Sequence, residues 1–134
     1  MILIIESRTT HNSERLLELL GNKVILRLFE SDRNKFEDIL RQFEQKKSDI
    51  QTIIFHASGR HGVTIENATT YLQQILEWKS GSTKLFAVSE GSDYRIAMQN
   101  IITDFGAGNN ASTDSYNQLV ERVENEVERA RGNR

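Results

Sequence analysis

The sequence predicts an α/β protein in which one five-stranded, mainly parallel sheet lies between two layers of helices. Short apolar runs that are typical of strands alternate along the chain with longer segments in which apolar residues recur at helical spacing. This alternation is the pattern of repeated strand–helix units around a parallel sheet. The 134 residues, 27% of them charged and 37% hydrophobic, fit one globular domain. We therefore interpret residues 1–134 as a single domain, a three-layer sandwich.

Four strands are predicted from clear apolar signals. The run Ile2-Leu3-Ile4-Ile5 is continuous, as a strand that helices cover on both faces requires. The other three are expected at residues 23–29, 52–55 and 84–88. Residues 110–113 contain no side chain that would bury well, so they are predicted to form a short edge strand at most.

Five helices are expected, each with apolar residues at a spacing of three or four. Capping side chains are expected at Ser31 and Asp32, at Thr64, at Ser92 or Asp93, and at Asp114 and Ser115. Glycines at positions 21, 81 and 106 mark three of the helix ends. The residues expected to face the sheet are Leu16, Leu17 and Leu20; Phe36, Ile39, Leu40 and Phe43; Ile65, Ala68, Leu72, Ile75 and Leu76; Tyr94, Ala97, Met98, Ile101, Ile102 and Phe105; and Tyr116, Leu119, Val120, Val123 and Val127.

Right-handed crossovers and short connections leave few arrangements for five such units. The commonest is the flavodoxin-like strand order 2-1-3-4-5, in which ligands bind in a crevice beyond the carboxyl ends of the first and third strands. We therefore expect any ligand to meet Glu6, Ser7 and the loop after Phe55.

The composition excludes several classes of site and partner. The chain has no cysteine, which rules out disulfides, thiolate metal sites and a cysteine nucleophile. The net charge is −2, and lysine and arginine are scattered without a basic run, so no nucleic-acid partner is expected. A run of 18 apolar residues is absent as well. We expect a cytoplasmic protein with no membrane segment.

The loop after the third strand is the strongest candidate site. In QTIIFHASGRHG a strand turns into a loop where His56, Ser58, Arg60 and His61 surround two glycines. A serine nucleophile activated by histidine, with Glu6 as the orienting acid, would lack the flanking pattern of a nucleophile elbow. An anion or nucleotide site is better motivated, because Arg60, glycine backbone and the start of the next helix favour negative charge. The same composition is also typical of a solvated turn.

A second convergence of polar residues is expected at Ser89, which ends the fourth strand. The candidate crevice residues are therefore Glu6, Ser7, His56, Ser58, Arg60, His61 and Ser89. We predict no catalytic residue, no metal site and no cofactor. The five-residue spacing of His56 and His61 in a loop is unspecific, and no nearby carboxylate completes a metal-binding set.

Several short motifs fit one known family. The first apolar run ends at Glu6, LFAVSEGSD places Ser89 after the fourth strand, and AMQNIITDFGAGNN leads from a helix into a Gly-Ala turn. The chain closes with the amphipathic segment SYNQLVERVENEVER. With the order and spacing of the elements, these motifs resemble a receiver domain of the response-regulator family over nearly the whole chain. In that likeness Ser89 matches the serine or threonine that senses phosphorylation.

The chain departs from the receiver pattern at the residues that carry out phosphoryl transfer. A receiver's first strand ends in two acids, whereas Ser7 follows Glu6 here. Its third strand ends in the aspartate that accepts phosphate, whereas this chain reads His56-Ala57-Ser58. The region that corresponds to the family's conserved lysine and proline is Ser112-Thr113-Asp114, which contains neither residue. Phosphoryl transfer to a carboxylate needs that carboxylate and oxygen ligands for Mg²⁺, so aspartyl phosphorylation is not expected.

The resemblance thus implies a degenerate receiver, or pseudo-receiver, which is not an enzyme and acts in signalling through protein contacts. It implies a partner surface formed by the fourth helix, the fourth strand and the fifth helix. Two alternatives stay open. One is an engineered α/β scaffold without a selected function, favoured by the absence of cysteine and of the six or seven prolines that average usage of about 5% predicts. The other is an anion or nucleotide binder at the crevice. The long irregular polar loops favour a natural chain.

Overall fold

The computed structural model describes residues 1–30, 33–106 and 108–132. Its sheet contains β1 (Ile2–Glu6), β2 (Val24–Leu28), β3 (Thr52–His56), β4 (Lys84–Val88) and β5 (Ala111–Asp114). The order is β2-β1-β3-β4-β5, and every described pairing is parallel. The predicted flavodoxin-like order is therefore confirmed. The predicted edge strand exists too, one residue later than expected.

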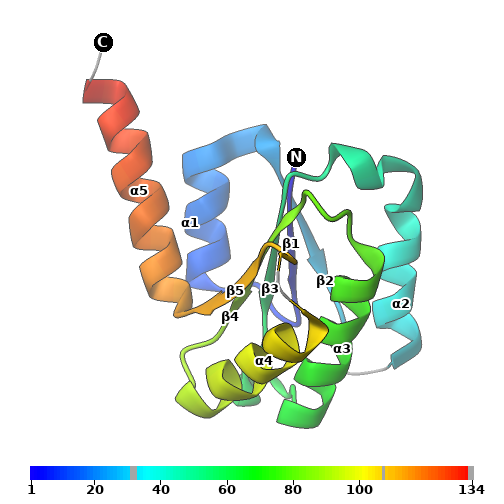
Figure 1. The fold of residues 1–134 in the computed structure, drawn as a ribbon. Helices are drawn as coiled ribbons and strands as arrows, with labels where there is room; N and C mark the ends of the chain where they lie inside the picture. The colour runs from blue at the N-terminus through cyan, green and yellow to red at the C-terminus, as the bar shows by residue number, and fades with distance from the viewer. Residues whose placement is uncertain (31–32, 107, 133–134) are drawn as a thin grey trace.

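The helices form the two outer layers of the sandwich. They are α1 (His11–Leu20), α2 (Arg33–Gln42), α3 (Ile65–Trp78), α4 (Ser92–Phe105) and α5 (Tyr116–Gly132), with short 3₁₀ turns at η1 (Gly21–Lys23), η2 (Glu44–Asp49) and η3 (Gly59–His61). Figure 1 shows α1 and α5 together on one face of the sheet, and α2, α3 and α4 on the other. The second half of α5 extends beyond the sheet (Figure 1). No helix in the described ranges has the length and apolar character needed to cross a bilayer.

Alternation along the strands divides the core into two clusters, because successive side chains point to opposite faces of a sheet. Leu3 and Ile5 pack with α2, α3 and α4, whereas Ile4 packs with α1 and α5. The larger cluster contains the aromatic residues Phe29, Phe36, Phe55 and Tyr71. By the same alternation Glu6 lies on the face of α1 and α5. So does His56, whose ring contacts Tyr116 of α5.

The predicted helix signals hold at several ends. Thr64 Oγ1 accepts the N–H of Asn67 at the start of α3, and Ser115 Oγ accepts the N–H of Gln118 at the start of α5. Gly21 ends α1 with a positive φ of 60°. The expected cap at residues 31–32 lies outside the described residues.

Other details of the sequence prediction are wrong. Helix α4 is preceded by Gly91 rather than capped by Ser92 or Asp93, because the Asp93 carboxylate accepts the N–H of its neighbour Tyr94 instead. Phe105 was expected to face the sheet but is 41% exposed, because it lies in the last turn of α4, beyond the core. Helix α3 ends at Trp78, before the expected Gly81.

The partner surface expected from the fourth helix, the fourth strand and the fifth helix stays a prediction. Strand β4 is paired with β3 on one side and β5 on the other, so its edges are covered. The strand at this edge of the sheet is β5. A surface that spans α4 and α5 therefore exposes β5 between them.

Candidate ligand site at the carboxyl end of the sheet

The ends of the parallel strands bring distant polar residues to one edge. Glu6 is aligned with Leu28, His56 with Val88, and Val88 with Asp114. A cavity of about 450 Å³ opens at this edge. It is lined by His56 and the turn η3, by the loop from β4 into α4, and by residues at the starts of α1 and α5. Its position agrees with the rule that ligands of open parallel sheets bind outside the carboxyl ends of the strands.

Glu6 is held behind the cavity by a closed set of hydrogen bonds. Its side chain is fully buried, and Ser13 Oγ donates to Oε2 over 2.7 Å. The backbone N–H of Thr10 donates to the same oxygen over 3.1 Å, and Tyr116 Oη donates to Oε1 over 2.9 Å. Burial raises the pKa of Glu6, while the hydrogen bonds from Ser13 and Tyr116 act in the opposite direction. Glu6 therefore ties β1 to α1 and α5, with both oxygens occupied.

His56 is the buried residue of the cavity wall. It is 5% exposed, and its ring lies against that of Tyr116 with centroids 4.8 Å apart. Burial, followed by the nearby His61, lowers the pKa of His56 to about 4, with Glu90 opposing this shift. His56 is therefore a neutral imidazole at pH 7, with one N–H and one acceptor nitrogen.

Two imidazole nitrogens at this wall lack partners. The ring of His61 lies 5.6 Å from that of His56, centroid to centroid. Nδ1 of each histidine is buried and has no hydrogen-bond partner among the described residues. Burial, and then the charges of Arg8 and Arg60, lower the pKa of His61. An unsatisfied buried polar group costs roughly 1–3 kcal/mol, so the two nitrogens favour any molecule that pairs with them.

The turn after β3 is shaped by its own polar residues. Ser58 Oγ accepts the N–H of Arg60, and Ser58 carbonyl oxygen accepts the N–H of His61. Ser7 Oγ donates to the carbonyl oxygen of His61 over 3.3 Å. Gly62 follows at a φ of 79°, in the left-handed region that favours glycine. Ser7 and Ser58 therefore hold the turn that presents Arg60 and His61.

The loop after β4 supplies another part of the lining. Ser89 is buried, its Oγ accepts the N–H of Gly91, and its carbonyl oxygen accepts from Arg95 Nη1 over 2.7 Å. Tyr94 Oη donates to the carbonyl oxygen of Val63 over 2.5 Å, which joins α4 to the segment after β3. Gly91 precedes α4, and no side chain in the described part of the protein caps this helix start. The Asp93 carboxylate in the first turn accepts the N–H of Tyr94, so a negative charge already lies at this end of the helix dipole.

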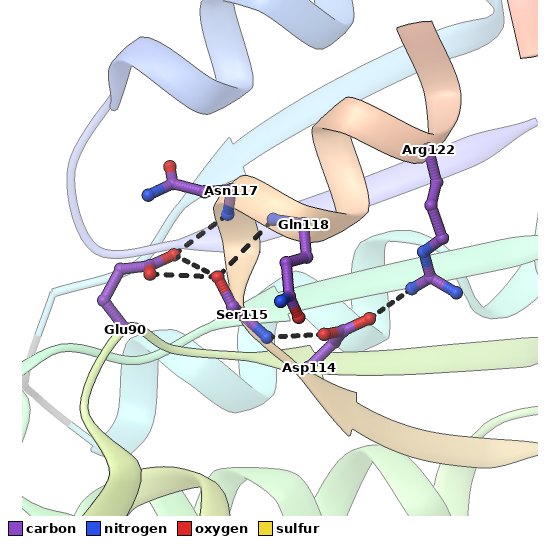
Figure 2. Close-up of polar contacts among 6 residues, drawn as sticks. All are labelled: Glu90, Asp114, Ser115, Asn117, Gln118 and Arg122. Atoms are coloured by element: carbon purple, nitrogen blue, oxygen red, sulfur yellow. Dashed lines mark hydrogen bonds and ion pairs between the residues drawn. The ribbon is translucent and has the colours of Figure 1, made fainter. Parts of the chain in front are cut away.

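Glu90 lines the same cavity but is committed to α5. Figure 2 shows its carboxylate directed at the start of that helix, where both oxygens accept from Ser115 Oγ and Oε1 accepts the N–H of Asn117. Asp114 accepts the N–H of Ser115 and forms an ion pair with Arg122 of α5 (Figure 2). These contacts satisfy N–H groups at the beginning of α5, and the carboxylate complements the helix dipole.

The structure separates the residues expected at the crevice into two sets. His56, Ser58, Arg60, His61 and Ser89 line the cavity. Glu6 and Ser7 lie behind it, one anchoring helices and the other supporting the turn.

The sequence interpretation missed part of the lining, most clearly Tyr116, Tyr94 and Asp93. Tyr116 and Tyr94 were expected only as inward residues of helices. Their place at the first turn of helices that follow strands was a usable signal, since such positions lie at the carboxyl edge of a parallel sheet. No group of three or more His, Asp or Glu side chains in the described ranges is arranged to hold a metal ion.

Comparison with known proteins adds no family to this description, because no family model, no curated protein and no solved structure matches the chain.

Proposed function

We propose that the chain is a non-catalytic signalling-type interaction domain, similar to a receiver but not switched by phosphorylation of an aspartate. The observation that carries this proposal is His56 at the end of β3. In the likeness to receivers this strand end would hold the phosphate-accepting carboxylate, and here it holds a buried neutral imidazole packed on Tyr116.

The surrounding carboxylates do not supply a substitute. Glu6 is fully buried with both oxygens hydrogen-bonded, and Glu90 accepts hydrogen bonds from Ser115 and Asn117. Asp93 accepts the N–H of Tyr94. Coordination of Mg²⁺ requires several oxygen ligands around one point, which this arrangement does not offer. The proposed domain therefore acts through binding.

A surface between α4, β5 and α5 is the proposed partner face. Ile96 of α4 is 64% exposed and borders a groove of about 390 Å³. Gln99 from α4, Thr113 from β5 and Gln118 from α5 also line it. An exposed isoleucine with hydrogen-bonding side chains around it suits the core and rim of a modest protein interface.

Phosphorylation is tested by incubation with Mg²⁺ and acetyl phosphate, followed by measurement of the intact mass. The expected result is an unchanged mass, while a response-regulator receiver treated in parallel gains one phosphate. A stoichiometric adduct on this chain that hydroxylamine removes would overturn the proposal, because that lability is the mark of an acyl phosphate.

The partner face is tested by capture of proteins from cells that produce this chain. Ile96→Glu is the test variant, and Leu28→Glu is the control, because Leu28 is 51% exposed on β2 at the opposite edge of the sheet. A protein retained by the wild type and the control, but lost with Ile96→Glu, is the expected result. Equal capture by both variants would contradict this face.

A further inference from the structure

We propose that the cavity at the carboxyl end of the sheet binds a small hydroxylated molecule through its phosphate group, which His56, His61 and Arg60 hold. This goes beyond the proposed interaction domain, since it assigns a ligand to a site that the partner face does not include. The lining residues of the cavity and of the α4–β5–α5 groove are different.

The first reason is the pair of unpartnered nitrogens. His56 is 5% exposed and lines the cavity, yet its Nδ1 has no partner among the described residues. His61 Nδ1 is in the same condition, and the two rings lie 5.6 Å apart. A phosphate group carries several oxygen atoms at one centre, so it can accept from two imidazoles at once. A neutral ligand with a single polar atom would leave one nitrogen unsatisfied.

The second reason is positive charge that has no ion-pair partner among the described residues. Arg8 and Arg60 are exposed, and neither has an ion pair within the part of the chain that the structure describes. Both lie close enough to His61 for their charges to lower its pKa. Arg60 lines the cavity itself, and a guanidinium presents a fork of donors that fits phosphate oxygens.

The acidic residues of the cavity indicate what the rest of the ligand carries. Glu90 lies in the loop from β4 into α4 and Asp93 in the first turn of α4, away in sequence from the turn that holds His61 and Arg60. Negative charge there repels a phosphate and accepts hydrogen bonds from hydroxyl groups. The cavity of about 450 Å³ falls within the usual range of small-molecule sites, roughly 300–1,000 Å³. A phosphate ester of a small polyol fits both parts of the cavity, with its phosphate at the histidines and Arg60 and its hydroxyl groups at the carboxylates.

The experiment follows the histidine ring protons by NMR while ribose 5-phosphate, inorganic phosphate or ribose is added. We expect saturable shifts of His56 and His61 with ribose 5-phosphate, weaker ones with phosphate, and none with ribose. The phosphate should raise the pKa of both histidines, because a bound anion favours their charged forms. Sodium chloride at the same ionic strength is the control for general salt effects.

Two variants locate the site. Arg60→Gln should weaken binding of ribose 5-phosphate roughly tenfold, as expected for loss of one hydrogen bond to a charged group. Arg129→Gln, which removes an equal charge from the exposed far end of α5, should leave binding unchanged. His56→Phe keeps a ring against Tyr116 and should abolish the shifts of His61 that ribose 5-phosphate causes. If this variant fails to fold, the exposed Arg60→Gln change still tests the site.

Three results would overturn the proposal. One is the absence of saturable shifts up to about 10 mM ligand, where a site with a Kd of 1 mM would be about nine-tenths filled. Another is an equal shift of the cavity histidines with sodium chloride at the same ionic strength, which would indicate a general salt effect. The third is equal affinity in the wild type and Arg60→Gln. None of these results bears on the acetyl phosphate test, which measures a covalent adduct.

Discussion

The face of the sheet under α2, α3 and α4 is closed by aromatic and aliphatic side chains, whereas the face under α1 and α5 holds a buried polar set at its carboxyl end. On the first face, the rings of Phe36 and Tyr71 stack with centroids 4.2 Å apart, and Phe29 meets Phe36 edge-on at 5.2 Å. On the second face, Glu6 and His56 are buried among side chains that include Tyr116.

The difference indicates which face of the sheet can carry a functional site. Apolar contacts stabilise without directional requirements, so the aromatic face contributes mainly to stability. Buried polar groups are costly unless each one is paired, and the pairing of Glu6 is complete while that of His56 is not. The polar face therefore combines a structural carboxylate with an imidazole that is free to respond to a ligand.

Phe36→Ala should give the largest effect, a loss of about 3–5 kcal/mol in the free energy of unfolding, because it opens a cavity in the aromatic face. Phe36 is fully buried and contacts the rings of Phe29, Phe55 and Tyr71. Urea titration followed by circular dichroism measures the change. Leu28→Ala, at a residue that is 51% exposed, should cost far less. A loss below about 1 kcal/mol for Phe36→Ala would contradict the assignment of stability to this face.

The pH dependence of stability should report His56 on the polar face. Its pKa is about 4 in the folded protein and 6.5 as a free group, so the unfolded chain binds more protons between these values. Stability should therefore fall on acidification from pH 6.5 to 4, by up to roughly 3 kcal/mol from this residue. His61 acts in the same direction. Glu6 opposes both, because its raised pKa lets the folded protein take up a proton first.

His56→Phe separates these contributions. The variant should lose most of the acid destabilisation that urea titrations at several pH values show for the wild type. Glu6→Gln should make the remaining dependence steeper, since it removes the opposing group. An unchanged slope in His56→Phe would mean that His56 titrates normally.

Tyr116→Phe should cost about 1–3 kcal/mol, because it leaves one oxygen of the buried Glu6 without its donor. Tyr94→Phe is the matched control, since Tyr94 donates to the backbone carbonyl of Val63 and serves no buried charge. Its expected cost is smaller, about 0.5–1.5 kcal/mol. Differential scanning calorimetry of both variants checks the order. A larger loss for Tyr94→Phe would contradict the importance of the Glu6 contacts.

Glu90→Gln should have the smallest effect, about 0.3–1 kcal/mol, from loss of a negative charge at the start of α5. Glu128→Gln makes the same change near the other end of this helix, where the dipole does not favour an acid. It should be neutral or slightly stabilising. Because salt screens exposed charges, the difference between the two variants should shrink in 1 M salt. A difference that persists there would indicate a different cause.

Much of the fold followed from the sequence because its signals are local. The strand at residues 84–88 was predicted with its observed bounds, and Thr64 was identified as a cap from the apolar spacing after it. Parallel strands with helical crossovers then left few orders to choose from. Local signals failed where several groups compete for one hydrogen bond. Asp93 was expected to cap α4, but it lies within the first turn, where its carboxylate accepts the N–H of Tyr94.

By itself the sequence determined that two histidines, Ser58 and Arg60 follow the third strand, and that this strand ends at the ligand edge of a parallel sheet. Only the tertiary structure decided that Glu6 is enclosed while His56 and His61 keep unpartnered nitrogens. The physical reason is that hydrogen-bond pairing and desolvation depend on neighbours in space. Tyr116, which binds Glu6 and packs on His56, is 110 positions from Glu6 along the chain, so no local pattern could reveal these contacts.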